Sequence, residues 1–424
     1  MDPRGIMITT VEKTNLSGTV KAKASKSCAH RLLICAALGK SPVKLHCEGM
    51  SRDIEATVAC LNALGAEISA AGDTITVCPI CKKAEGLCHL YCGESGSTLR
   101  FLLPVVGALG VNAVFHMEGR LPERPLAPLD EELTAHGMTL RKEGDLLYCE
   151  GQLTAGEYTL PGNVSSQYIS GLLMALPLLE GESCLRVTGK WESAAYVSLT
   201  ENALKDSGIA FTKKDSCYTL LGGQSFALPA KCAVEGDWSN AAFWLCAGAL
   251  LEKGLTVTGL RMDSAQGDKE VIDILRKFGA HVEVGEEGIF VSRGAMKGIT
   301  FSAAAIPDLV PVLSVVAAAA HGETRIEEAA RLRIKESDRL QSTCEMLCRL
   351  GADAEEKPAG LVIRGGKDLA GGTVSAWGDH RIAMSAAVAA ILCRESVTVE
   401  GSEAVEKSYP DFWRDYDALL TKEG

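Results

Sequence analysis

The chain has 424 residues, of which 47% are hydrophobic and 23% are charged, and its formal net charge is −11. This length allows roughly two to four domains with sizeable cores, and the composition excludes a disordered or collagen-like chain. The acidic balance argues against a general nucleic-acid binder. No stretch has the roughly 20 consecutive apolar residues of a membrane span, and the first residues lack a secretory pattern, so we expect a cytoplasmic protein.

Five segments in chain order share an amphipathic helix, a glycine and a short hairpin of alternating strands. The glycines lie at intervals of 72, 71, 71 and 72, which predicts internal repeats in which glycine ends each helix in a left-handed conformation. They are Gly65, Gly137, Gly208, Gly279 and Gly351. A sixth glycine falls at Gly424, so the sixth unit lacks its hairpin. The N-terminal strand-like segment IMITT is free to complete it, and we expect the two termini to share a domain.

Each repeat also has an upstream strand-like segment, which follows an Ala- and Leu-rich helix. The strand-like segments are VKLHC, AVFHMEG, SCLRVTG, LTVTG, ETRIEEA and VTVEG. The unit is therefore βαβαββ. Six such units exceed one compact domain, and we divide them three and three at the Gly- and Pro-containing stretch 222–231. We expect an α/β protein of two similar domains, residues 18–231 and residues 1–17 plus 232–424.

Two loops in every unit precede a helix, where exposed N–H groups and the helix dipole attract anions. These loops hold more Lys and Arg than helix capping requires. We expect the cations to converge on one cleft between the domains and to bind small, highly charged anions. They are Lys26, Arg31, Arg100, Arg124, Lys335, Arg339, Arg381 and Lys407.

Several loop residues also have a purely structural interpretation. Lys335 and Arg339 could share a solvated helical face, and Asp308 could begin a helix or accept a proton from a substrate hydroxyl. The residues suited to capping helices are Ser27, Ser97, Ser166 and Asp379. The chain has neither a P-loop nor a dinucleotide-binding glycine motif, which argues against ATP and NAD.

The sixteen cysteines raise the question of disulfides and zinc. We expect reduced thiols in a cytoplasmic chain, most of them small core residues. Cys78, Cys81, Cys88 and Cys92 resemble a zinc ribbon only loosely, because such sites pair two CxxC elements across a longer insert. We therefore expect no metal there.

The loop motifs, taken together, resemble the enolpyruvyl transferase family and, within it, the shikimate-pathway branch. They are KSxxxR, GxSGSTLR, ERP, SSQ, PD, KESDR, GDHR and YPDFW, and they cover essentially the whole chain. The resemblance implies the enolpyruvyl transferase fold, an inside-out α/β barrel of six repeats. It also implies transfer of the enolpyruvyl group of phosphoenolpyruvate to the 5-hydroxyl of shikimate 3-phosphate, on the route to chorismate and aromatic amino acids. Phosphate is released without a metal or organic cofactor. We expect a monomer with no nucleic-acid or membrane partner.

The resemblance also assigns two groups of binding residues. Those for shikimate 3-phosphate are Lys26, Ser27, Arg31, Ser165, Ser166, Gln167, Ser193, Tyr196, Asp308 and Lys335. Those for phosphoenolpyruvate are Lys26, Gly96, Arg124, Gln167, Arg339, Arg381 and Lys407. Two positions depart from the family pattern, because Glu94 stands where the family has Asn and Arg331 where some members have Asn.

The implied reaction needs an acid and a base. Protonation of the methylene carbon makes its neighbour electrophilic, the hydroxyl adds, and the tetrahedral intermediate expels phosphate. Glu336 is the first candidate for the proton transfer, with Lys407 or His380 as alternatives. Asp308 would orient or deprotonate the hydroxyl, and Lys26 would stabilise the departing charge. Closure of the domains would exclude water.

Two other functions stay open. The first is the sister reaction on a UDP-amino sugar, whose enzymes characteristically have Lys-Asn near the start and a Cys in a mobile loop. This chain has Lys26-Ser27 instead, and its corresponding loop, EGRLPERP, has no Cys. A non-catalytic anion sensor would not need Lys26, Asp308 and Glu336 together.

Overall fold

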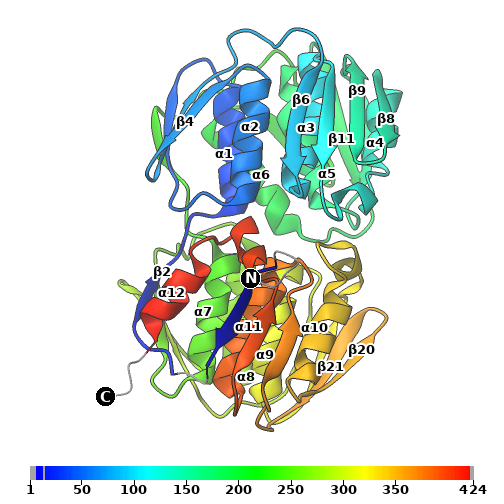
Figure 1. The fold of residues 1–424 in the computed structure, drawn as a ribbon. Coiled ribbons are helices and arrows are strands. Elements are labelled where there is room, and N and C mark those ends of the chain that lie inside the picture. The colour runs from blue at the N-terminus through cyan, green and yellow to red at the C-terminus, as the bar shows by residue number, and fades with distance from the viewer. Residues whose placement is uncertain (1–5, 13–14, 421–424) are drawn as a thin grey trace. The chain divides into compact units, whose positions relative to one another are not determined.

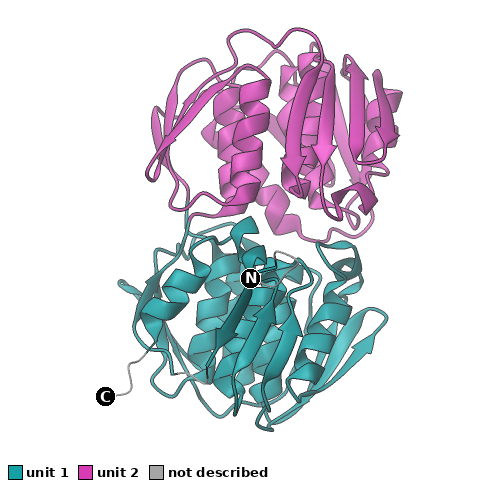
Figure 2. Ribbon diagram, in the orientation of Figure 1, with its two compact units in different colours: residues 1–23, 235–424 teal, residues 24–234 magenta. Residues whose placement is uncertain are grey.

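The computed structural model describes residues 6–12 and 15–420, and it divides into two compact units (Figures 1 and 2). Unit 2 runs from Ala24 to Val234. Unit 1 contains the chain before Ala24 and the chain from Glu235 onward, so the segments near both termini belong to one unit. Each unit is built from three repeats, as the glycine spacing predicts.

Unit 2 has three four-stranded sheets. The first sheet has the strand order β14 (Lys231–Ala233), β3 (Val43–His46), β5 (Thr74–Cys78), β4 (Glu67–Ala71). The second has the order β6 (Cys88–Gly93), β7 (Ala113–Met117), β9 (Leu146–Gly151), β8 (Met138–Glu143). The third has the order β10 (Glu157–Pro161), β11 (Glu182–Thr188), β13 (Cys217–Leu221), β12 (Phe211–Lys214). In each sheet the first two strands are parallel and the remaining pairs antiparallel. The helices are α1 (Lys26–Ala37), α2 (Arg52–Ala63), α3 (Gly96–Leu109), α4 (Leu129–Ala135), α5 (Ser166–Ala175) and α6 (Ala194–Asp206).

Unit 1 repeats this pattern, with one shorter sheet. The first sheet has the strand order β2 (Thr19–Lys21), β15 (Leu255–Thr258), β17 (Gly288–Ser292), β16 (His281–Gly285). The second has the order β18 (Thr300–Ser302), β19 (Gly322–Glu327), β21 (Gly360–Gly365), β20 (Asp353–Lys357). The third and shorter sheet has the order β22 (Gly372–Ser375), β23 (Val397–Glu400), β1 (Ile8–Val11). The helices are α7 (Trp238–Leu250), α8 (Val271–Phe278), α9 (Val310–Ala319), α10 (Arg339–Arg349), α11 (His380–Ala389) and α12 (Phe412–Leu419). Short 3₁₀ turns include η1 (Leu121–Glu123), η4 (Pro307–Leu309), η5 (Ala330–Ile334) and η7 (Ser402–Lys407).

The unit boundaries fall a few residues beyond the expected 17/18 and 231/232. Strand β2, at the start of the first repeat, pairs in parallel with β15 of the fourth repeat. Strand β14, at the start of the fourth repeat, pairs in parallel with β3 of the first. The chain therefore changes units after these strands, so residues 18–23 lie in unit 1 and residues 232–234 in unit 2.

The repeat glycines adopt the conformation that the sequence predicts. Gly65, Gly137, Gly208, Gly279 and Gly351 have φ values of 108°, 103°, 73°, 102° and 95°. Only glycine enters this left-handed region without strain, so each position ends a helix and turns the chain into the following hairpin. The expected sixth glycine, Gly424, lies outside the described residues.

The sixth repeat is completed by the start of the chain, as expected. Strand β1 pairs antiparallel with β23, with Ile8 opposite Glu400 and Val11 opposite Val397. It takes the place that the second strand of a hairpin has in the other five sheets.

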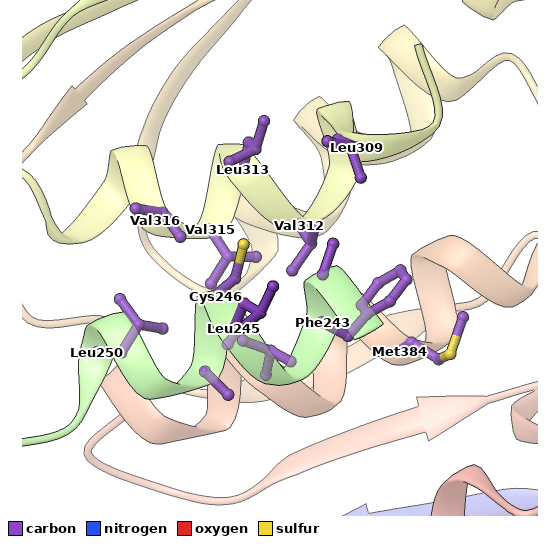
Figure 3. Close-up of a cluster of buried hydrophobic side chains, with 14 of the residues drawn as sticks. Phe243, Leu245, Cys246, Leu250, Leu309, Val312, Leu313, Val315, Val316 and Met384 are labelled. Atoms are coloured by element: carbon purple, nitrogen blue, oxygen red, sulfur yellow. The ribbon is translucent and has the colours of Figure 1, made fainter. Parts of the chain in front are cut away.

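The first helix of each repeat is buried inside its unit, with the sheets outside. Every residue of α7 is buried, and α7, α9 and α11 pack on one another. Figure 3 shows Phe243 and Cys246 of α7, Val312 of α9 and Met384 of α11 in this core. A helix that is apolar all round is stable only when covered on all sides, which explains the Ala- and Leu-rich composition of these segments.

The helix caps differ from the expected residues in three of four cases. Ser25, Ser95 and Ser165 cap α1, α3 and α5, whereas Asp379 caps α11 as expected. Ser27, Ser97 and Ser166 lie inside the first turns, where their hydroxyls do not serve as caps. The physical reason is that each loop offers serines two positions apart or adjacent, and only the backbone path decides which one precedes the helix.

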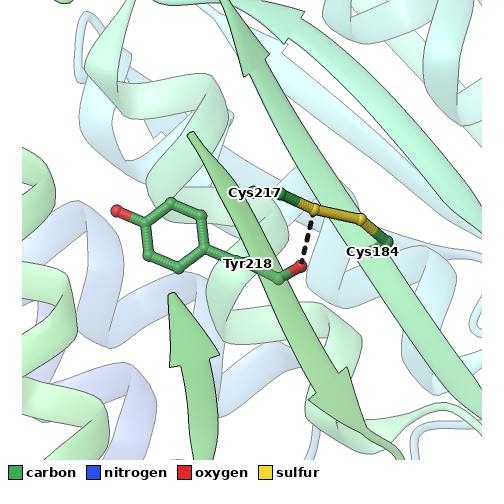
Figure 4. The surroundings of a disulfide bond; sticks show 3 residues. All are labelled: Cys184, Cys217 and Tyr218. Atoms are coloured by element: carbon green, nitrogen blue, oxygen red, sulfur yellow. Dashed lines mark hydrogen bonds between the residues drawn. A yellow bond between two sulfur atoms is a disulfide. The ribbon is translucent and has the colours of Figure 1, made fainter. Parts of the chain in front are cut away.

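Half of the sixteen cysteines are small buried residues, fewer than predicted, and two are not reduced. Fourteen are free, and eight of these are buried. Cys184 and Cys217 form a disulfide, which corrects the expectation that all thiols are reduced (Figure 4). They lie on the antiparallel neighbours β11 and β13 with their Cα atoms 6.6 Å apart, within the reach of a disulfide.

The described residues lack two features, a membrane-spanning helix and a three-residue metal site. None of their helices is long and apolar enough to cross a membrane. No group of three or more His, Cys, Asp or Glu residues among them is placed to hold a metal ion.

Candidate active site

In unit 2, the first turn of α1 carries an ion pair. Lys26 Nζ lies 2.9 Å from Asp53 Oδ2 at the start of α2. Asp53 is buried, so it fixes the ammonium group of Lys26 at the end of the helix. Asp53 is not among the residues expected from the sequence, although it belongs to the second helix-preceding loop of its repeat.

Arg31, one turn further along α1, is held by its own unit. Its Nε donates to Thr200 Oγ1 at 2.7 Å, and its Nη2 donates to the Tyr196 carbonyl at 2.8 Å and to Ser170 Oγ at 3.2 Å. Nη1 donates to the Ser27 carbonyl at 2.5 Å. Burial lowers the pKa of Arg31 to about 10, so the guanidinium remains charged at neutral pH. In this structure Arg31 mainly ties α1 to α5 and α6.

Two guanidinium groups lie against the N-terminus of α3. A Cβ atom at Gly96 would lie 2.6 Å from Arg100 Nη1 and 2.9 Å from Arg124 Nη1, so the two guanidinium groups approach the backbone of Gly96 closely and would have to shift for a larger residue. Arg100 Nη1 also donates to Gln167 Oε1 at 3.0 Å, and Gln167 Nε2 donates to Ser97 Oγ at 3.0 Å. The positive helix end and two cations make this a strong anion-attracting surface.

The remaining predicted residues of unit 2 lie at the starts of α5 and α6. Ser165 caps α5 and accepts from the Gln167 N–H, and Ser166 is the first residue of that helix. Ser193 precedes α6 with a φ of 54°, a strained value for a side chain of this kind, and Tyr196 follows in the first turn. Glu94 is exposed, and its carboxylate packs at Gly119.

In unit 1, Asp308 is surrounded by three cations. Its Oδ1 lies 2.7 Å from Arg339 Nη1 and 3.4 Å from Lys335 Nζ, and its Oδ2 lies 3.1 Å from Arg381 Nη2. Burial alone would raise the pKa of Asp308, but Arg381, Lys335 and Arg339 hold it well below its usual range. Asp308 is therefore a carboxylate at neutral pH. Burial lowers the pKa of Lys335, against the opposing effect of Asp308.

Arg339, the first residue of α10, links three carboxylates. Its Nε donates to Asp379 at 2.7 Å, its Nη1 to Asp308 at 2.7 Å and its Nη2 to Glu336 at 2.8 Å. Its side chain is 1% exposed, so substrate could reach it only by displacing a carboxylate. Burial lowers the pKa of Arg339, but Asp379, Glu336 and Asp308 outweigh this effect and raise it.

Arg381 in α11 has a buried donor to spare. Its Nη1 donates to the Asp308 carbonyl at 3.1 Å, while Nε has no hydrogen-bond partner within the described part of the chain. The residue is 4% exposed. A buried N–H without an acceptor costs about 1–3 kcal/mol, which a bound anion would offset.

The remaining residues singled out in unit 1 lie on η5, η7 and α11. Lys407 ends η7 and is buried, next to Ser408, whose carbonyl accepts from Asn240 of α7. Arg331 in η5 donates to the Ala304 carbonyl at 3.3 Å. His380 begins α11, with its Nδ1 3.8 Å from Asp379 Oδ1.

Each unit thus brings most of its predicted residues together. In unit 2 the starts of α1, α3, α5 and α6 are joined by Arg31, Arg100 and Gln167. In unit 1 Asp308, Lys335, Glu336, Arg339 and Arg381 form one ionic cluster. That both groups face one cleft stays a prediction.

The chain also matches a known protein family. The family model of EPSP synthase (3-phosphoshikimate 1-carboxyvinyltransferase) matches residues 11–416. The chain belongs to the EPSP synthase family. The family and fold expected from the loop motifs are therefore confirmed.

Individual relatives agree. The protein named 3-phosphoshikimate 1-carboxyvinyltransferase from Clostridium kluyveri is 40% identical to this chain, and the match covers 96% of each chain. The protein of the same name from Clostridium acetobutylicum is 42% identical, and the match covers 95% of each chain. The EPSP synthase structure from Acinetobacter baumannii superposes with a TM-score of 0.79 at 24% identity, over 97% of this chain and 98% of that one. The enolpyruvyl transferase NikO from Streptomyces tendae gives 0.78 at 20% identity, over 98% and 97%. These two structures bear on the fold alone.

Proposed function

We propose that the chain transfers the enolpyruvyl group of phosphoenolpyruvate to the 5-hydroxyl of shikimate 3-phosphate, releasing phosphate. Family membership supports the reaction. The observation on this chain that carries the proposal is the cluster around Asp308. It combines an ionised carboxylate with cations, one of which, Arg381, has a buried donor suited to an anionic substrate.

The chemistry needs balanced proton transfers. In the addition step, the methylene carbon of phosphoenolpyruvate gains a proton, and the substrate hydroxyl loses one as its oxygen bonds to the neighbouring carbon. In the elimination step, the bond to phosphate breaks and the new methyl group gives up a proton to restore the double bond. Glu336 is proposed to give and recover the carbon-bound proton, and Asp308 to orient the hydroxyl and accept its proton.

The cations have separate proposed roles. Lys26, Arg124, Arg381 and Lys407 bind phosphoenolpyruvate and stabilise charge that develops on the departing phosphate. Arg339 binds the same substrate after exchanging a carboxylate contact. Gly96 leaves room for phosphate at the start of α3, and Gln167 contributes from α5.

Phosphorylated shikimate is assigned to a second group of residues. The proposed contacts are Lys26, Ser27, Arg31, Ser165, Ser166, Gln167, Ser193, Tyr196, Asp308 and Lys335. For Arg31 the proposed contact is secondary to its role in joining α1, α5 and α6.

We also propose a cytoplasmic monomer. Fourteen free thiols against one disulfide support the compartment, and the origin of all the assigned residues in one chain supports the monomer.

The test is phosphate release by EDTA-treated protein given phosphoenolpyruvate and one of two acceptors. We expect release with shikimate 3-phosphate and none with UDP-N-acetylglucosamine. Release with the sugar nucleotide alone would assign the sister reaction instead. Release with neither acceptor would favour an anion sensor.

A further inference from the structure

The sheet β6–β7–β9–β8 of unit 2 carries a cluster of rings on its outer face. His89 and Tyr91 lie on β6, and His116 lies on the parallel neighbour β7, directly opposite Tyr91. The ring of Tyr91 stacks on that of His116 at 4.3 Å between centroids, and Tyr91 is 60% exposed. None of these residues takes part in the proposed reaction.

The two imidazoles approach each other closely. His89 Nδ1 lies 2.9 Å from His116 Nε2. Neutral imidazole nitrogens are the commonest metal ligands in proteins.

The two nitrogens are near enough to bind one ion together. Two imidazole nitrogens at about 2.05 Å from an ion lie about 2.9 Å apart when they are 90° apart, and about 3.3 Å apart at the tetrahedral angle. The observed 2.9 Å is the distance of a hydrogen-bonded pair and changes when the rings turn toward an ion, so it does not choose between these geometries.

We propose that His89 and His116 form a surface site for a divalent transition-metal ion that prefers imidazole ligands, such as Ni²⁺ or Cu²⁺. The two rings, held side by side by strands β6 and β7, provide two ligands, and water completes the coordination. To chelate, the rings turn so that both lone pairs point at the ion instead of sharing a proton. His89 is exposed and has room to do so. The site has two protein ligands, and the described residues hold no group of three or more His, Cys, Asp or Glu that could bind a metal ion.

The experiment titrates untagged, EDTA-treated and dialysed full-length protein with Ni²⁺ alone and follows binding by calorimetry. We expect one site per chain that weakens at least about tenfold in both His89→Ala and His116→Ala. Phosphate release by these variants should equal that of the parent protein, because neither residue belongs to the proposed active site.

Two matched controls separate this site from others. His46→Ala removes another exposed histidine, which contacts Glu48 instead of a second imidazole, and Cys348→Ala removes an exposed thiol. Both should bind Ni²⁺ like the parent. If an alanine variant unfolds, Ni²⁺ binding is measured on the less disruptive His116→Gln, which should also bind at least about tenfold more weakly than the parent. Equal binding by the parent and a His89→Ala/His116→Ala double variant, or no binding by the parent, would overturn the proposal.

Discussion

At the scale of single residues, Asp308 shows how the ionic cluster controls the charge of a carboxyl group. Three cations lie within 3.4 Å of its carboxylate oxygens, and together they hold its pKa well below the usual 3.8. A carboxyl whose pKa is lower in the folded than in the unfolded protein stabilises the fold when ionised. This contribution is complete above the unfolded pKa and is lost as pH falls through the folded pKa.

The Asp308→Asn variant tests this environment. We expect its free energy of unfolding at pH 7 to be lower by about 3 kcal/mol, because the substitution leaves buried cations without their carboxylate. The difference from the parent should be constant above about pH 5 and should shrink as pH falls below 4. Urea unfolding across this range measures it, and a difference that does not change with pH would contradict the account.

Glu336 is the proposed proton donor and acceptor at carbon. Glu336→Gln keeps the size of the side chain and a hydrogen-bonding group for Arg339, so binding of shikimate 3-phosphate should hardly change. Turnover should fall about a hundredfold or more, the usual contribution of acid–base catalysis. The matched control is Glu345→Gln in the following helix α10. The carboxylate of Glu345 pairs with the exposed Arg349, and this variant should keep full turnover. Unchanged turnover in Glu336→Gln would remove this residue from the mechanism.

Arg124 is assigned to phosphoenolpyruvate by the family resemblance, and its guanidinium group lies beside Gly96 at the start of α3. Arg124→Ala should raise the KM for phosphoenolpyruvate at least about tenfold, since a charged hydrogen bond to substrate is lost. Arg120→Ala, in the same segment but paired with Glu123 at the surface, should leave that KM unchanged. An effect confined to shikimate 3-phosphate would show that the two substrates are assigned to the wrong residues.

The motifs predict which residues gather in each unit, but not how they bond. Arg31 and Arg339 stand at the expected positions, yet their guanidinium groups bind mainly to partners in the chain itself. Those partners, such as Thr200 and Asp379, lie far away in sequence or look like ordinary helix residues. A side chain's partner depends on tertiary packing, which a motif does not record.

At the scale of elements, the repeat glycines allow a controlled comparison. Gly65 and Gly208 occupy the same position of two repeats and both have positive φ. A Cβ at Gly65 would lie 2.4 Å from the Lys82 carbonyl oxygen, whereas a Cβ at Gly208 would meet nothing within 4 Å. Gly65→Ala should therefore destabilise the protein by about 1 kcal/mol or more beyond the cost of Gly208→Ala, which comes from the left-handed backbone alone. Chemical unfolding of both variants measures the difference, and equal costs would contradict the predicted clash.

Elements with strong periodicity were predictable, and short ones were not. The six strand-like segments and the buried helices follow directly from apolar periodicity, and the pairing of β1 with β23 follows from counting strands. The parallel pairing of β2 with β15 and of β14 with β3 was not foreseen, because three-residue strands carry little pattern and their partners lie far along the chain. The choice between neighbouring serines as helix caps depends on the same missing information.

At the scale of the whole molecule, sequence and structure support one family. Six repeats on two units match the fold of solved enolpyruvyl transferases, and the family model covers nearly the full chain. The disulfide between Cys184 and Cys217 could not be predicted, because bond formation depends on two strands meeting at a suitable distance.

The most direct test of the central claim is the identity of the product. The purified protein is given equal amounts of phosphoenolpyruvate and shikimate 3-phosphate, and the mixture is followed by ³¹P and ¹H NMR. The account predicts inorganic phosphate and a vinyl ether of shikimate 3-phosphate in equal amounts, with no pyruvate. Phosphate accompanied by pyruvate, with shikimate 3-phosphate unchanged, would show hydrolysis instead of transfer and would contradict the account.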